Sequence, residues 1–176
     1  MNSTQVKQLI STEIDRVFTE SFIEAEQPHK KPAYPFATFQ VLLSHINEYE
    51  HDNIERRNYN QANQTIDLYK LEQPQMTMTI NAYARKPSDP SVMDTSIEDA
   101  TDLAQRLKDW FDFEGDLFLN KNQISVIESE DITQRDVLII DNYERRYGFD
   151  VRLRYNREIN FTIETIENTN IERTGI

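Results

Sequence analysis

The sequence predicts an α+β fold in which a mainly antiparallel β-sheet carries two main helices packed on one face. Two segments place apolar residues at three- and four-residue spacing, as amphipathic helices do, and several others alternate apolar and polar residues, as half-buried strands do. The order along the chain is helix, strands, helix, strands, with few helical segments of crossover length. Because parallel strands need such crossovers, this order favours an antiparallel sheet.

Residues 3–23 are expected to form the first helix, with Ser3 or Thr4 as its N-cap. The apolar residues that follow the helical period are Val6, Leu9, Ile10, Ile14, Val17, Phe18 and Phe22. Residues 26–35 contain three of the six prolines. Since proline disfavours helix in the residue before it, we expect this segment to be an extended connector.

Three strands are expected between the two helices. Residues 36–49 are rich in aromatic and β-branched residues, and residues 76–85 alternate with a period of two. A further strand is expected at 65–71, separated from the last one at Pro74. Residues 50–64 are almost wholly polar, so we expect a long loop there, either in a hairpin or extending beyond the sheet.

The second helix is expected to begin at Ser96, where Ser96 and Asp99 stand at capping-box spacing. Its apolar residues are Ile97, Ala100, Leu103, Ala104, Leu107, Trp110 and Phe111. Because Trp110 and Phe111 continue this apolar stripe, we expect them to lie in the core and not to stack on a ligand.

The last third of the chain is expected to consist mainly of strands. Residues 124–127 form a short apolar run that suits a strand, whereas residues 137–140 fit either a strand or a short helical turn. Residues 143–155 alternate regularly, and the alternation continues to Ile163. This pattern predicts one long strand or a hairpin pair.

The composition indicates one folded, acidic domain, which we expect to span residues 1–176. Leu, Ile, Val and Phe make up about a quarter of the chain, above the roughly 20% below which chains tend to stay disordered. The formal net charge of −12 argues against a general nucleic-acid binder. Cysteine is absent, which excludes disulfides and thiolate metal sites. No apolar run approaches membrane-spanning length, and the N-terminal residues lack the apolar core of a signal peptide.

Residue patterns that would support catalysis are weak. His45 and His51, with Glu50 and Asp52 beside them, could form a metal site, but they and His29 fit solvated loop histidines better. No serine lies in a glycine-flanked elbow. Acidic clusters in so acidic a chain are mostly solvated faces. We therefore expect a protein that is not an enzyme, with no catalytic residue, cofactor or metal ion.

The arginines are unevenly distributed and are the better candidates for a functional surface. Two lie together in the polar stretch, and five crowd into residues 145–157. On a strand alternate residues share a face, so the even-numbered arginines would lie opposite the apolar residues. Such a row is either a solvated face with ion pairs or a protein–protein surface, and both readings stay open. The candidates for a subunit interface are Arg56, Arg57, Arg145, Arg146, Arg152 and Arg154.

Four stretches taken together resemble the bacteriophage neck or tail terminator family, whose members cap the tail tube at the head–tail junction. The stretches are PAYPFATFQVL (32–42), TINAYA (79–84), the helix over 100–111, and RDVLIIDNYERRYGFDVRLRY (135–155). The likeness lies in their order and spacing and spans about residues 30–157. The polar stretch at 50–64 and a C-terminal extension at 158–176 have no counterpart in this likeness.

The resemblance implies a structural virion protein built on an antiparallel sheet, without an active site or cofactor. It implies a ring of identical copies, expected to be a hexamer, that caps the tail tube, contacts tail tube and sheath proteins and joins the tail to the head connector proteins. Genomic DNA would pass through without specific binding, and an acidic conduit wall would repel its phosphates. The protein would be made in the host cytoplasm and lie in the virion at the head–tail junction.

Two alternatives stay open beside this reading. One is another virion joining protein, such as a head completion or connector protein. The other is a small metal-dependent hydrolase or nuclease that uses acidic ligands and His45 or His51.

Overall fold

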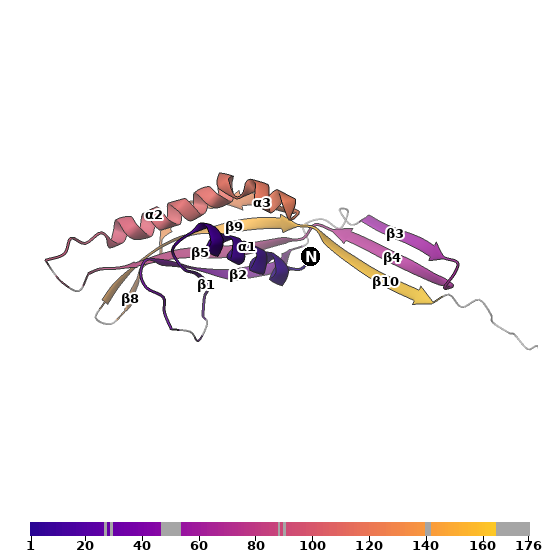
Figure 1. Ribbon diagram of the computed structural model, residues 1–176, viewed down its shortest axis with the longest axis horizontal. Helices are drawn as coiled ribbons and strands as arrows, with labels where there is room; N and C mark the ends of the chain where they lie inside the picture. Colours follow the sequence, from indigo (N-terminus) through magenta and orange to yellow (C-terminus); the bar gives the residue numbers. More distant parts are fainter. Residues whose placement is uncertain are drawn as a thin grey trace, which may run out of the picture.

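The computed structural model describes residues 1–26, 28, 30–46, 54–87, 89, 91–139 and 142–164. Two sheets follow one another along the long axis of the molecule (Figure 1). We call the larger one, with the helices on it, the body, and the three-stranded one that projects from its end the arm. The strands of the body, in spatial order, are β1 (Phe22–Glu24), β2 (Phe36–Ile46), β5 (Gln75–Arg85), β9 (Asn142–Tyr155) and β6 (Ile124–Ser129).

Two further short strands extend the edge of the body, and three strands make the arm. Strands β7 (Thr133–Gln134) and β8 (Val137–Ile139) pair with β9 beyond the end of β6. The arm consists, in spatial order, of β10 (Arg157–Glu164), β4 (Thr65–Glu72) and β3 (Ile54–Asn60). Every pairing is antiparallel except that of β1 with β2. This confirms the predicted α+β fold with a mainly antiparallel sheet.

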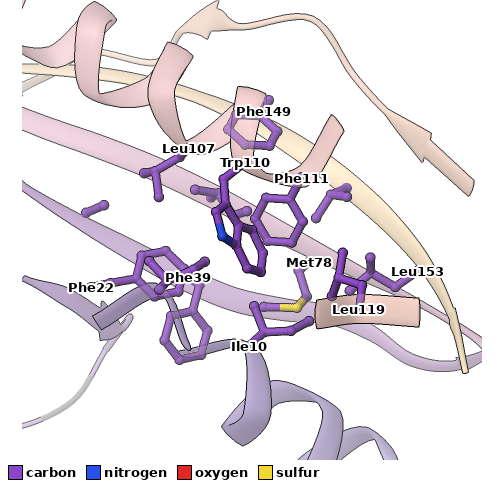
Figure 2. Packing of buried hydrophobic residues seen from close by; sticks show 14 of the residues in the cluster. Ile10, Phe22, Phe39, Met78, Leu107, Trp110, Phe111, Leu119, Phe149 and Leu153 are labelled. Atoms are coloured by element: carbon purple, nitrogen blue, oxygen red, sulfur yellow. The ribbon is translucent and has the colours of Figure 1, made fainter. Parts of the chain in front are cut away.

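The core lies between one face of the body sheet and the helices. These are α1 (Ser3–Val17), α2 (Ser96–Asp109), the short π-helical segment η1 (Trp110–Glu114) and α3 (Asp116–Lys121). Phe39, Ile80 and Phe149 form one row across the three central strands, and all are buried. Figure 2 shows Ile10 and Leu107 reaching this core from the two main helices. Both helices therefore pack on the same face, as predicted.

The two aromatic residues that follow α2 lie in the core, as the sequence predicts. Trp110 and Phe111 are buried and meet edge to face, with ring centroids 4.9 Å apart. Phe111 also meets Phe149 of β9 edge to face at 6.2 Å. Such contacts add to the burial of apolar area, which supplies most of the stabilisation of a core.

The helix starts differ from the predicted ones. The N-cap of α1 is Asn2, not Ser3 or Thr4: Asn2 Oδ1 accepts from the Gln5 N–H at 2.9 Å, and Gln5 Oε1 accepts from the Asn2 N–H at 2.8 Å. The predicted capping box at Ser96 is also wrong, because Ser96 is already the first helical residue. Its N–H donates to Asp94 Oδ1 at 3.1 Å.

The first helix also ends earlier than predicted. It stops at Val17, and Phe22 belongs to β1 instead of the helix. Strand β1 escaped the sequence analysis because three residues are too few to show a period. Its pairing with β2 places the Phe22 ring on that of Phe39, with centroids 4.7 Å apart.

The arm is the largest departure from the predictions. Residues 54–60 form strand β3, so the stretch expected to be a loop contributes to a second sheet. Residues 143–155 belong to one strand, but the alternation beyond them belongs to β10, which pairs with β4 and not with β9. The ambiguous run at 137–139 is strand β8. The predictions for 47–53, 140 and 165–176 concern residues outside the described ranges.

Gly148 fixes how β9 lies beside β5. It stands opposite Asn81, and a Cβ atom at this position would lie 2.4 Å from the Ile80 carbonyl oxygen and 2.5 Å from Asn81 Oδ1. The carbonyl belongs to the sheet ladder and cannot move away without breaking it. The close approach of the two central strands therefore depends on the missing side chain.

We expect Gly148→Ala to lower the free energy of unfolding by about 1–3 kcal/mol or more, because the added methyl group overpacks the β5–β9 contact. Urea unfolding followed by circular dichroism measures the change. Ser125→Ala on exposed β6 is the control and should change stability by less than about 0.5 kcal/mol. An unchanged unfolding midpoint for Gly148→Ala would contradict the assigned register.

Candidate assembly surfaces

The arm continues the central strands of the body. Gln75 and Arg154 are the last β5–β9 pair, and Glu72 and Arg157 are the first β4–β10 pair. Between them the ladder is interrupted at Pro74, which has no N–H to donate. Its carbonyl oxygen accepts from the Tyr155 N–H at 3.1 Å. The interruption lets the strands leave the body sheet and re-pair as a separate one.

A buried carboxylate marks the junction between arm and body. The side chain of Glu72 is only 2% exposed. Its Oε1 accepts from Arg157 Nη1 at 2.6 Å and lies 4.0 Å from His45 Nε2. Its Oε2 lies 3.1 Å from Lys70 Nζ. Glu72 thus faces one cation from its own strand β4 and one from the neighbouring strand β10.

The protonation of Glu72 follows from these contacts. Burial by itself would raise the pKa of the carboxyl group, but hydrogen bonds from Lys70 and Arg157 and their positive charges outweigh it and hold the pKa below its ordinary value. A carboxylate with a lowered folded-state pKa stabilises the fold above its unfolded-state pKa. The contribution is lost as the pH falls through the folded-state value.

The two faces of the arm differ in chemistry. Residues paired across strands project to the same face. One face carries the rows Tyr59–Ile66–Ile163 and Arg57–Leu68–Phe161, whereas the other carries polar pairs such as Asp67 and Thr162. Thr162 Oγ1 donates to Asp67 Oδ1 at 2.8 Å on that second face. The arm is therefore amphipathic. We call the face with these two outer rows its apolar face, although nearer the body the same face carries Glu55 opposite Lys70 and Arg157 opposite Glu72.

The structure separates the six arginines predicted to form an interface. Arg56 and Arg57 lie on β3 in the arm. The remaining four lie on β9 in the body and are Arg145, Arg146, Arg152 and Arg154. Because successive side chains of a strand point to opposite faces, Arg145 lies on the face that carries the core and the even-numbered three lie on the other. The six do not form one patch.

Carboxylates of the same chain already hold part of this arginine group. Asp136 Oδ2 accepts from Arg145 Nη1 at 3.1 Å, and its Oδ1 accepts from the Arg146 N–H at 2.7 Å. Burial would raise the pKa of Asp136, but these hydrogen bonds outweigh it and lower the pKa. Arg152 Nη1 lies 3.5 Å from Glu128 Oε2. A role of these arginines in an interface remains a prediction.

A seventh arginine, which the sequence analysis did not single out, organises the polar face of the body. Arg135 Nη1 donates to Thr79 Oγ1 at 2.7 Å, and its Nη2 donates to Asp150 Oδ1 at 3.0 Å. The side chain thus reaches from the edge of the sheet across β9 to β5. No spacing in the sequence could have indicated this, because the pairing of β7 and β8 with β9 brings Arg135 there.

The proline-rich connector is tied to the opposite end of β9. Lys31 Nζ donates to Glu144 Oε1, which also accepts from the Tyr34 hydroxyl at 2.7 Å. The ammonium group lies 5.1 Å from the centre of the Tyr34 ring and 5.8 Å from that of Tyr83. Burial would lower the pKa of Lys31, but these partners raise it above its ordinary value. This end of the body is therefore held by charge and aromatic packing.

The described part of the chain gives little support to a metal site at His45 and His51. His45 is exposed at the end of β2, whereas His29 and His51 lie outside the described residues. Among described residues no group of three histidines, aspartates or glutamates is placed to hold a metal ion. None of the helices described is long and apolar enough to cross a membrane.

Comparison with known proteins now adds to this geometry. The sequence profile of a family described as phage neck terminator protein matches residues 4–176. The chain belongs to the phage neck terminator family. No curated protein sequence matches it. The match runs through both segments that had no counterpart in the sequence likeness, 50–64 and 158–176, so the strands of the arm lie within the matched region.

Family membership fixes the general role of the chain. Phage neck terminator proteins are structural components of the virion at the head–tail junction, where they contact other head and tail proteins. The surfaces described above are therefore candidates for contacts between proteins.

We expect Glu72→Gln to lower the free energy of unfolding by about 1–3 kcal/mol at neutral pH, because Lys70 and Arg157 lose a charged partner. The difference from wild type should shrink as the pH falls through the lowered pKa of Glu72, where the native carboxylate takes up a proton. Urea unfolding of both proteins at neutral and acid pH measures it. Glu158→Gln on exposed β10 is the control and should change little. An equal difference at every pH would contradict this role of the charge.

Proposed function

We propose that this neck terminator is the subunit of a closed ring of six copies that caps the tail tube and joins it to the head connector. The main support for this proposal is the family match over residues 4–176. In this role the ring contacts the tail tube on one side, with sheath proteins where they are present, and head connector proteins on the other. It leaves a central conduit for the genome and performs no catalysis.

The asymmetry of the molecule supports a ring. A cyclic ring uses one interface repeatedly, in which two different patches of the subunit meet head to tail. The chain offers such different patches, because an amphipathic arm projects from one end of a body that carries many carboxylates (Figure 1). A two-fold dimer would instead need one self-complementary patch.

The charge supports an open conduit. With 31 acidic and 19 basic side chains, the subunit has a formal net charge of −12. Duplex affinity depends on cationic side chains that replace phosphate counterions, and an acidic wall repels the phosphates. We therefore propose a conduit wall with more carboxylates than arginines and lysines. Such a wall lets DNA pass without binding it.

We expect the purified protein to form rings of six copies with a central opening. Sedimentation velocity gives the copy number, and negative-stain images give the shape. A chain that stays monomeric even with tail tubes added would contradict the ring. Immunogold labelling of isolated tails should mark the end that meets the head, whereas labelling confined to tail-free heads would indicate a different joining protein.

We expect the protein not to retain duplex DNA in an electrophoretic mobility assay at low ionic strength, where any electrostatic binding is strongest. A basic DNA-binding protein run in parallel serves as the positive control. A shifted band that disappears with added salt would contradict the proposed acidic conduit wall.

A further inference from the structure

The apolar face of the arm is open to solvent. Its outer two rows hold five apolar side chains and Arg57, with no carboxylate among them. Phe161 is 64% exposed, and Tyr59 and Ile163 are exposed beside it. Figure 1 shows the arm projecting from the body with no described helix over it. A three-stranded sheet normally gains its stability by burying such a face.

A second exposed apolar patch lies on the body. Phe113 at the end of η1 and Leu117 in α3 are 81% and 85% exposed. They stand four residues apart along consecutive helical turns, a spacing that places side chains next to each other. The neighbouring residues Asp112, Glu114 and Asp116 are all acidic and exposed, and Asp112 Oδ2 accepts from Lys108 Nζ at 2.9 Å. The patch is therefore apolar at its centre and negative at its rim.

The neighbouring helix face adds a concave surface to this patch. Between α1 and α3 lies a groove of about 600 Å³. Its apolar lining comes from Met1, Leu9 and Phe118, and Phe118 directly follows Leu117 in α3. An aromatic side chain that enters such a groove loses its contact with water, which is typical of the residues that dominate binding energy.

We propose that the apolar face of the arm docks on the patch around Phe113 and Leu117 of a second copy of this chain, with Arg57 facing the carboxylates at its rim. Apolar side chains meet apolar side chains at the centre, and the cation meets anions at the edge. Glu114, in the middle of the acidic run, is the partner assigned to Arg57. This inference rests on the ring proposed above and names the surfaces that close it.

The size of the arm explains why a ring suits this contact. The whole face of the arm, of which the outer half is apolar, covers roughly 26 Å by 14 Å. This area is about half of the roughly 800 Å² that each partner buries in a standard interface. One arm contact is therefore too small to hold an isolated pair. In a closed ring each copy both offers an arm and receives one, so the contacts act together with those between bodies.

The absence of native cysteine allows a direct test by cross-linking in the full-length chain. The double variant Phe161→Cys with Leu117→Cys places one thiol on the arm face and one on the patch. After mild oxidation, a denaturing gel without reductant should show a ladder of disulfide-linked copies. Its largest species should contain as many copies as the ring. The matched control is Asn160→Cys with Leu117→Cys, because Asn160 neighbours Phe161 but lies on the opposite arm face. It should give at most dimers.

Charge reversal provides the second measurement. Arg57→Glu alone and Glu114→Lys alone should each weaken association roughly fivefold, as expected for an ion pair at the rim of an interface. The two changes combined in one chain should restore it. Sedimentation measures the association of all four proteins.

The outcomes separate this inference from the ring itself. If rings form but the 161–117 pair gives no ladder, or gives the same pattern as the 160–117 control, the arm contact is refuted and the ring stands. If the combined reversal fails to restore association, the pairing of Arg57 with Glu114 is refuted. If no assembly forms under any condition, both the ring and the arm contact are refuted.

Discussion

The ion group around Glu72 is the interaction that holds the first pair of arm residues together, at the point where the strands leave the body sheet. The body has its own core, whereas Glu72 is the one buried residue among those whose burial is described in the arm strands. A carboxylate withdrawn from water is tolerated only while its cations stay in place, so Glu72 restricts the positions that Lys70 and Arg157 can take. Both cations belong to the arm. The ion group therefore holds β4 and β10 together at the root of the arm, and His45 of β2, whose Nε2 lies 4.0 Å from Glu72 Oε1, is the body side chain beside it.

Much of the body could be predicted from the sequence, because its residues are buried on one side only. Alternation marked β5 and β9, and helical spacing marked α1 and α2. The parts that escaped prediction lack this contrast. Strand β3 is polar because much of it is exposed to water, and β1 is too short to show a period. The N-cap at Asn2 could have been read from Gln5 three residues later, since an amide can take the place of the usual acid.

The candidate surfaces were harder to predict than the elements. The crowding of arginines was visible, but spacing along a chain does not reveal which strands become neighbours. The chain leaves the body sheet after Tyr155, and only that departure separates Arg57 from the arginines of β9. The pairing of β6, β7 and β8 with β9 gives Arg152 and Arg145 partners within the chain. The apolar face of the arm stayed hidden because its residues come from three segments far apart in the sequence.

The arm also has two outer strands, β3 and β10, each of which pairs only with β4 among the described elements. Open strand edges beside an apolar face are the feature that leads free subunits to stack edge to edge into aggregates. Charged side chains on these strands, such as Glu55 on β3 and Glu158 on β10, oppose such stacking, since like charges repel when identical edges meet. The apolar face of the arm can thus bind a different surface, while charge repulsion prevents newly made subunits from pairing through their strand edges.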